Sequence, residues 1–180
     1  WNITRFVISK LDGAGKHAHA SLPNGLTLAD RWICSRYNRL LADVDRLMHA
    51  YNYGEAGRQI QEFVWGEFAD WYVEVAKVQL ETGPAARSAT QHVLYTVLEG
   101  SLRLLHPFMP FVTEEAWQYL TSGSRKAQSD QAPTSGEDAL GASQAALHSI
   151  MLAPYPQADP VALDESAERD WALVQEIITG

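Results

Sequence analysis

The chain has 180 residues, of which 46% are hydrophobic and 20% are charged, and it carries a net charge of −8. This length and composition suit one globular domain, and the negative charge argues against a protein that grips nucleic acid by bulk charge alone. No apolar run approaches the roughly 18 residues that cross a bilayer, and a single cysteine, Cys34, excludes an internal disulfide, so we expect a cytoplasmic protein with no membrane partner.

The first predicted elements in chain order are a helix over 1–9, a loop over 10–25 and a long helix that starts after Thr27. Asp30 follows Thr27 by three residues, which is the spacing of a capping box. Apolar residues then recur every three or four positions as far as Tyr51. This spacing predicts one buried helical stripe about seven turns long.

Two further long helices are predicted, the first over 55–82 and the second from Pro84 to His106. Gly83 is typical of the position after a helix end, and a proline fits the first turn of the next helix. Pro107 cannot continue the third helix, because proline lacks the backbone N–H and clashes with the preceding turn.

The sequence HPFMP predicts a corner between the third helix and a fourth that begins at Pro110 and ends near residue 120. Phe108 and Met109 are expected to plug the end of the bundle. The fourth helix holds Phe111, Val112, Trp117 and Leu120.

The last third of the chain changes character over 121–148, which is rich in Ser, Gly, Ala and Gln and holds no aromatic residue. We expect a flexible insertion there, an extended apolar return over 149–156, and a last helix capped by Asp164. The predicted fold class is therefore all-α, an antiparallel bundle of about four long helices plus a shorter C-terminal helix. We predict a bundle core over 1–120, and a segment over 149–180 that completes the same domain.

Motifs of known catalytic and nucleotide-binding sites are absent, including glycine-rich phosphate loops, GxSxG and HExxH. Glu114 and Glu115 are adjacent, so on a helix they point about 100° apart and cannot oppose each other as acid and base. Glu67, Asp70 and Glu74 share a helix face, but no matching ligand pair is evident elsewhere, which favours a solvated or salt-bridged face. We predict no catalytic residue, no metal site and no cofactor in this chain. The sequence instead indicates a binding or scaffolding module.

Five segments, taken in order, resemble one family. They are WNITRFV (1–7), LADRWICSRYNRL (28–40), YNYGEAGRQIQEFVWGEFADWYVEVAK (51–77), LLHPFMPFVTEEAWQYL (104–120) and SIMLAPYP (149–156). Together they resemble the anticodon-binding helical domain of class I aminoacyl-tRNA synthetases, and the third resembles the valyl enzymes in particular. The equivalent domain of the isoleucyl enzymes is the alternative within the family, and a helical interaction scaffold with no RNA role is the alternative outside it.

The resemblance implies a role as one part of a larger enzyme. The bundle would hold the anticodon stem-loop of tRNA-Val, while a separate catalytic core joins valine to the tRNA using ATP with Mg²⁺. The HIGH and KMSKS signatures of that core are absent from this chain, which begins with Trp1 rather than Met. We therefore expect a non-catalytic, monomeric piece of a longer protein, whose partners are the tRNA and the remaining synthetase domains.

An anticodon presents unstacked bases, which suit flat side chains and guanidinium planes, whereas its phosphates require Lys or Arg. Residues 1–52 carry seven Lys or Arg against four Asp, whereas the remainder carries seven basic and 18 acidic residues, so an anionic partner should prefer the first third. The tRNA-binding candidates are polar, basic or aromatic residues that fall off the core stripes near helix ends: Asn2, Arg5, Phe6, Lys10, Lys16, Pro84 and Arg87.

Each candidate has a structural alternative. Arg5, the first choice, could form a salt bridge to a neighbouring helix, Phe6 could belong to the core, and Arg87 could be a plain surface residue. Three arginines flank the first long helix and could contact RNA or the catalytic body, although solvated helix charge is the simpler interpretation: Arg31, Arg36 and Arg39. The other predictions are a core Trp71, an undecided Trp65, hydrogen-bonded structural roles for His92 and His106, and an inert thiol at Cys34.

Overall fold

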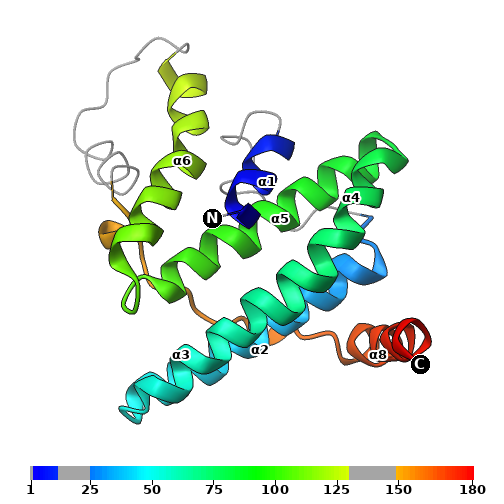
Figure 1. Ribbon diagram of the computed structural model, residues 1–180, viewed down its shortest axis with the longest axis horizontal. Coiled ribbons are helices and arrows are strands. Elements are labelled where there is room, and N and C mark those ends of the chain that lie inside the picture. The colour runs from blue at the N-terminus through cyan, green and yellow to red at the C-terminus, as the bar shows by residue number, and fades with distance from the viewer. Residues whose placement is uncertain (1, 12–24, 130–148) are drawn as a thin grey trace.

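A computed structural model describes residues 2–11, 25–129 and 149–180 of the protein. Over these residues it contains helices and no strands, and the long helices pack side by side (Figure 1). The predicted all-α fold class is confirmed.

The first two helices, α1 (Asn2–Lys10) and α2 (Leu28–His49), follow the sequence prediction closely. The capping box at the start of α2 is present: the Thr27 hydroxyl accepts a hydrogen bond from the Asp30 N–H at 3.2 Å, and the Asp30 carboxylate accepts one from the Thr27 N–H at 2.9 Å. The other carboxylate oxygen of Asp30 accepts a hydrogen bond from the Tyr72 hydroxyl at 2.7 Å, in the interior of the bundle. The cap of α2 is therefore also a tertiary contact to the next long helix.

The second long helix differs from a regular α-helix. It consists of α3 (Tyr53–Glu62), a π-helical segment η2 (Phe63–Tyr72) and α4 (Val73–Thr82), and its first α-helical residue is Tyr53 rather than the predicted residue 55. The Val73 N–H donates to the Phe68 carbonyl, which is the five-residue hydrogen bond of a π-helix. Three buried residues follow this five-residue spacing: Phe63, Phe68 and Val73. In an α-helix, side chains five residues apart would point in different directions around the helix axis. The predicted long helix is therefore present, but its middle segment is π-helical rather than α-helical.

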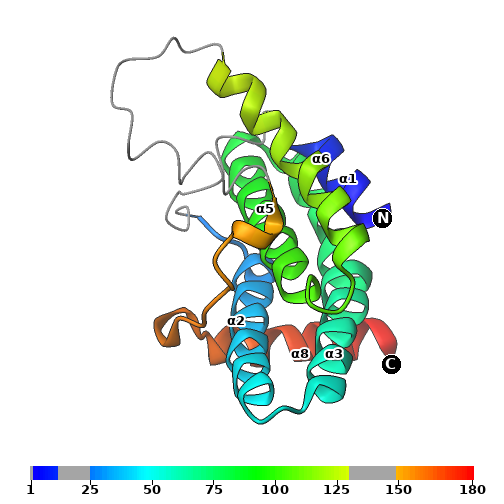
Figure 2. The same ribbon diagram turned by 90° about the vertical axis from the view of Figure 1, so that its left-hand side faces the viewer.

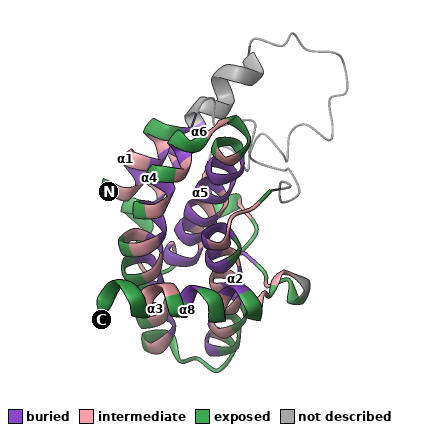
Figure 3. Ribbon diagram, turned by 90° about the vertical axis from the view of Figure 1, so that its right-hand side faces the viewer, coloured by how far each residue is buried: buried purple, intermediate pink, exposed green. Residues whose placement is uncertain are grey.

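Helix α5 (Pro84–Leu105) runs through the centre of the bundle and is buried along most of its length (Figure 3). Helix α6 (Pro110–Ser129) begins at the predicted proline but continues nine residues beyond the predicted end at 120. The first part of the predicted flexible insertion is therefore helical, because Ser and Gly lower helix propensity without preventing continuation of a helix that is already formed. The rest of that insertion, 130–148, lies outside the described residues.

The corner between α5 and α6 is only partly the apolar plug that the sequence predicts. Phe108 packs against the core, and it approaches α3 closely because Gly57 has no side chain: a Cβ there would lie 3.3 Å from the Phe108 ring. Met109 is 38% exposed, so the expectation that it plugs the end of the bundle was wrong, and Phe111, at the start of α6, is 91% exposed. His106 has the predicted structural role, because its Nδ1 lies in hydrogen-bond contact with Thr113 Oγ1 at 2.8 Å.

The return segment runs through two short 3₁₀ turns, η3 (Ile150–Leu152) and η4 (Pro160–Ala162), before the last helix, α8 (Glu165–Thr179). The extended conformation predicted for 149–156 therefore does not hold in η3. Glu114 of α6 fixes this turn: its carboxylate accepts hydrogen bonds from the Ser149 hydroxyl at 2.9 Å and the Ile150 N–H at 3.1 Å.

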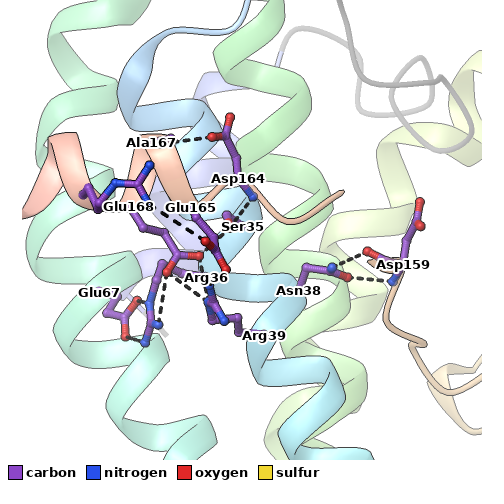
Figure 4. A network of polar contacts seen from close by, with 11 residues as sticks. Ser35, Arg36, Asn38, Arg39, Glu67, Asp159, Asp164, Glu165, Ala167 and Glu168 are labelled. Atoms are coloured by element: carbon purple, nitrogen blue, oxygen red, sulfur yellow. Dashed lines mark hydrogen bonds and ion pairs between the residues drawn. The ribbon is translucent and has the colours of Figure 1, made fainter. Parts of the chain in front are cut away.

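Helix α8 crosses α2 at a steep angle on the outside of the bundle (Figures 1 and 2). The two helices are joined by a stacked tryptophan pair, Trp32 and Trp171, with ring centroids 4.7 Å apart. Upstream of α8, the Asn38 side-chain amide makes two hydrogen bonds to the backbone of Asp159 (Figure 4). Its nitrogen donates to the Asp159 carbonyl, and its oxygen Oδ1 accepts from the Asp159 N–H at 2.8 Å. These contacts attach the C-terminal segment to the bundle.

The N-cap of α8 gives a prediction for the pH dependence of stability. Hydrogen bonds from the Ser166 hydroxyl, the Ala167 N–H and the Arg31 guanidinium lower the pKa of Asp164 from its ordinary value of 3.8 to about 2. A carboxyl whose pKa is depressed by folding stabilises the protein above its unfolded pKa, and this stabilisation is lost as the pH falls through the folded pKa. Asp164→Asn is therefore expected to lower the free energy of unfolding at neutral pH, and its difference from wild type should shrink between pH 4 and pH 2.

Urea unfolding followed by circular dichroism across this pH range is the appropriate measurement. Asp170→Asn, on the exposed side of the same helix, is the matched control. A difference between Asp164→Asn and wild type that stays constant down to pH 2 would contradict the proposed role of the charged cap.

Candidate functional site

The exposed face of α1 gathers four of the seven predicted RNA-binding residues. Successive residues of an α-helix are about 100° apart, and Thr4 and Val7 of α1 are buried against the bundle. Asn2, Arg5, Phe6 and Lys10 therefore share the opposite side; all are exposed except Phe6, which is half-buried.

Phe6 lies between two lysines. The Nζ atom of Lys10 is 5.8 Å from the centroid of the Phe6 ring, and the Nζ atom of Lys77, on α4, is 5.6 Å from it. Ammonium groups within about 6 Å of an aromatic centroid are attracted by the ring electrons. The Phe6 ring, a predicted RNA-binding residue with a core position as its alternative, packs partly against the core and is also part of a cationic, aromatic cluster at the surface.

Lys77 is the member of this cluster that the sequence analysis missed. It lies in the segment 51–77 that carries the family resemblance, but no local pattern places α4 beside α1, so the sequence gives no sign of its contact with Phe6. Its Nζ also forms an ion pair with Glu74 Oε1 at 2.6 Å, and both side chains are about half exposed. Arg5 differs, because among the described residues it has no ion-pair partner. Its predicted alternative, a salt bridge to a neighbouring helix, is not observed in this part of the chain.

The start of α5 lies near the same end of the bundle. The Gln91 side-chain amide donates a hydrogen bond to the Lys10 carbonyl at 2.6 Å and so fixes the end of α1 against α5. Pro84 and Arg87, both exposed, precede Gln91 by one to two turns, and Pro84 lies roughly 10 Å from it along the helix axis. The structure thus brings these two candidates to the end of the bundle that carries Lys10, whereas Lys16 lies outside the described residues.

The three arginines of α2 are engaged within the protein, and Figure 4 shows the contacts of Arg36 and Arg39. Arg36 Nε lies 2.8 Å from Glu67 of η2, Arg39 Nε lies 2.9 Å from Glu168 of α8, and an Arg31 nitrogen lies 2.6 Å from Asp164. The hydrogen bond to Glu67 is the main reason that the pKa of Arg36 is raised. These side chains fasten α8 and η2 to α2, so the interpretation of simple solvated charges was wrong.

A polar cavity of about 220 Å³ lies beside Arg36 and Arg39, and Arg58 of α3 also lines it. Its basic groups face carboxylates: Arg58 pairs with Glu55 and Glu62, and Arg36 pairs with Glu67. A site for an anion needs cations whose charge is not already neutralised. The exposed face of α1 is the better candidate for binding an anionic partner.

Other residues singled out in the sequence have structural roles. Trp71 is half-buried, with its ring edge-on to Trp171 at 6.5 Å, whereas Trp65 is 52% exposed. Burial, together with the nearby charge of Asp30, raises the pKa of the Cys34 thiol from 9.0 to about 12, which favours the protonated thiol over the reactive thiolate at neutral pH.

The predicted acidic helix face is largely paired, since Glu67 binds Arg36 and Glu74 binds Lys77. Within the described ranges, no group of His, Cys, Asp and Glu side chains has the arrangement of a metal site. In the same ranges, no helix combines the length and the apolar character needed to cross a membrane.

Comparison with known proteins identifies the family. Residues 30–180 match the family described as the anticodon-binding domain of tRNA ligase. The chain is 44% identical over 178 residues to a valine–tRNA ligase of Dehalococcoides mccartyi, and this match covers 99% of the chain and 18% of that protein. Valine–tRNA ligases of Neisseria meningitidis and Geobacillus kaustophilus are 39% and 37% identical to it, and each match covers 99% of the chain.

The chain therefore spans less than a fifth of the length of these relatives. Helix α1 precedes the part that matches the family description, but it falls within the alignments to the relatives, which cover nearly the whole chain. The family match, the similarity to the ligases and the all-helical fold agree with the resemblance carried by the five ordered motifs. The chain belongs to the anticodon-binding domain family of tRNA ligases.

Proposed function

We propose that this chain is the anticodon-recognition domain of a valine–tRNA ligase. It holds the anticodon stem-loop of tRNA-Val on the exposed face of α1 and the adjoining start of α5. The observation that carries the proposal is the Phe6 ring flanked by Lys10 and Lys77, next to an Arg5 that has no ion-pair partner among the described residues.

This cluster has the chemistry that a single-stranded RNA loop requires. Unstacked bases bind to aromatic faces and guanidinium planes, and lysines neutralise phosphates. Phe6 provides the ring, Arg5 a planar donor and Lys10 a positive charge, while Lys77 adds an ammonium group whose charge is shared with Glu74. Pro84 and Arg87 extend the same surface at the start of α5, and Asn2 extends it at the start of α1.

The rest of the activity belongs to the longer protein. The remaining domains of the ligase join valine to the tRNA with ATP and Mg²⁺, and the part represented by this chain contributes no catalytic group. The relatives named above are all valine–tRNA ligases, which favours the valyl over the isoleucyl assignment. A monomeric state, a cytoplasmic location and a phosphate contact by Lys16 remain predictions.

Replacing Arg5 by alanine is expected to weaken binding of the tRNA-Val anticodon stem-loop by about 1–3 kcal/mol, because a contact between a guanidinium and a base would be lost. This free energy corresponds to a roughly 5- to 150-fold higher Kd. Lys10→Gln and Lys77→Gln should weaken binding without regard to base sequence, and each should reduce the slope of log Kd against log salt by about one. Fluorescence titration at several salt concentrations measures both effects.

Arg169→Ala is the matched control, since Arg169 is an exposed arginine on α8, away from α1. An unchanged Kd for Arg5→Ala removes Arg5 from the site. If the wild-type chain binds the stem-loop no better than an unrelated acidic helical bundle does at low salt, the alternative of a protein-interaction scaffold gains instead.

A further inference from the structure

A second surface, separate from the exposed face of α1, is apolar. A cavity of about 100 Å³ opens between α1, η2, α5 and α6, and its lining includes Ile3, Trp65, Leu102, Leu105 and Val112. We refer to it as the α1–α6 groove.

The rim of the α1–α6 groove exposes apolar side chains. Trp65 is 52% exposed, Val112 is 43% exposed and Met109 is 38% exposed, and all three line the groove. Phe111, which precedes Val112 in the first turn of α6, is almost fully exposed. Scattered exposed hydrophobic residues are normal, but a contiguous set around a concave surface is typical of a docking site.

The floor of the groove contains an unsatisfied polar atom. The Ser101 hydroxyl lines the cavity, is buried, and has no hydrogen-bond partner among the described residues. Leaving a buried hydroxyl without a hydrogen bond is unfavourable, so most buried hydroxyls in proteins have a hydrogen-bond partner. An occupant that brings one backbone or side-chain polar atom into the groove would supply it.

The lining excludes RNA as the occupant, since it contains no lysine or arginine to neutralise phosphates. An apolar protein surface is the chemistry that fits. In each relative, more than four-fifths of the polypeptide lies outside the region that matches this chain. A large amount of polypeptide is therefore available to cover the groove. Ile3 and Thr4 of α1, the first described helix, lie in its wall, which places the groove beside the N-terminal end of the described chain.

We propose that the α1–α6 groove is the surface on which the rest of the ligase docks, through an apolar segment that inserts between Trp65 and Val112. This inference rests on the proposed function only in its choice of occupant, which is the remainder of a valine–tRNA ligase. The groove faces a different side of α1 from Arg5, so the domain can bind its own enzyme and an anticodon at the same time. Docking would fix the position of the exposed face of α1 relative to the catalytic core.

Site-specific photo-crosslinking in the complete ligase polypeptide, without tRNA, tests the proposal. The photo-reactive residue p-benzoylphenylalanine replaces Val112 in one variant and Val78, an exposed valine on α4, in the matched control. Peptide mass spectrometry of the Val112 variant should show crosslinks, within one polypeptide, to parts of the ligase outside these 180 residues. The yield of these crosslinks should be several-fold higher than in the control. Crosslinks between two copies, crosslinks confined to these 180 residues, or a yield equal to that of the control would each overturn the proposal.

A stability comparison supplies a second readout. Val112 is in the first turn of α6 and is exposed in the isolated chain, so Val112→Asp should leave the Tm of the 180-residue chain nearly unchanged. In the complete ligase the same substitution would bury a carboxylate, so the Tm should fall by several degrees. An equal Tm change in both proteins contradicts docking at the groove. Binding of tRNA by the isolated chain should not respond to Val112→Asp, so failure of docking and failure of anticodon binding are distinguishable.

Discussion

Replacing Trp171 by alanine is expected to lower the free energy of unfolding by about 3–5 kcal/mol, the usual range for removing a buried tryptophan. Trp171 is 5% exposed, stacks on Trp32 with ring centroids 4.7 Å apart and meets Trp71 edge-on at 6.5 Å. The ion pairs that also join α8 to α2 are partly exposed, and each contributes only about 0–1 kcal/mol. The aromatic contacts are therefore the main attachment of α8.

Chemical denaturation followed by tryptophan fluorescence and circular dichroism measures this loss. Trp171→Phe should cost less than Trp171→Ala, because it keeps an aromatic ring and removes an indole N–H that is buried without a partner among the described residues. Arg169→Ala, on the exposed side of α8, should change stability little. A loss below about 1 kcal/mol for Trp171→Ala would show that α8 is held mainly by its ion pairs.

Gly100→Ala is expected to be the most disruptive single-methyl substitution in α5. A Cβ at this position would lie 1.7 Å from the Tyr37 hydroxyl oxygen and 2.7 Å from the ring carbon that bears it. Burial is the main reason that the pKa of Tyr37 is raised, and its ring packs against Phe63 at 5.9 Å, so the side chain has little room to move. Overpacking of this kind typically costs 1–3 kcal/mol and occasionally more, so we expect a loss of at least about 2 kcal/mol.

Gly54→Ala is the matched control for this prediction. It makes the same chemical change in the first turn of α3, where a Cβ would meet nothing within 4 Å, so it should stabilise the protein by about 0.4–1 kcal/mol. Adding Tyr37→Phe to Gly100→Ala removes the closest contact and should recover part of the loss in a double-mutant cycle. Equal effects of the two alanine substitutions would show that the close approach of Tyr37 to α5 is not a constraint.

Much of the fold could be predicted from local patterns. The stripe of apolar residues and the capping box located α2, and the Gly83–Pro84 pair located the junction between α4 and α5. These features depend on backbone preferences within a few residues, which a single sequence displays directly. The π-helical segment η2 could not be predicted, because its buried residues Val64, Phe68 and Tyr72 recur every four positions as in an α-helical stripe, and only packing against the other helices selects the wider turn.

The candidate site was only partly predictable for a related reason. The types of Arg5, Phe6 and Lys10 and their positions off the core stripe indicated an exposed polar face on α1. Lys77 is 71 residues from Phe6 in sequence, and Glu168 is 129 residues from Arg39, so both contacts depend on how distant helices dock. Local sequence patterns carry no information about such partners. This is why one basic residue of the site was missed and three arginines were interpreted as solvated.

Recognition of the anticodon is the central property proposed for this domain. The most direct test compares binding of the 180-residue chain to a tRNA-Val transcript and to the same transcript carrying the anticodon of tRNA-Ile, at fixed salt. We predict that the wild-type chain prefers the valine anticodon by at least about fivefold, equivalent to ~1 kcal/mol, and that Arg5→Ala reduces this preference. Equal affinity of the wild-type chain for both transcripts would contradict the proposed function.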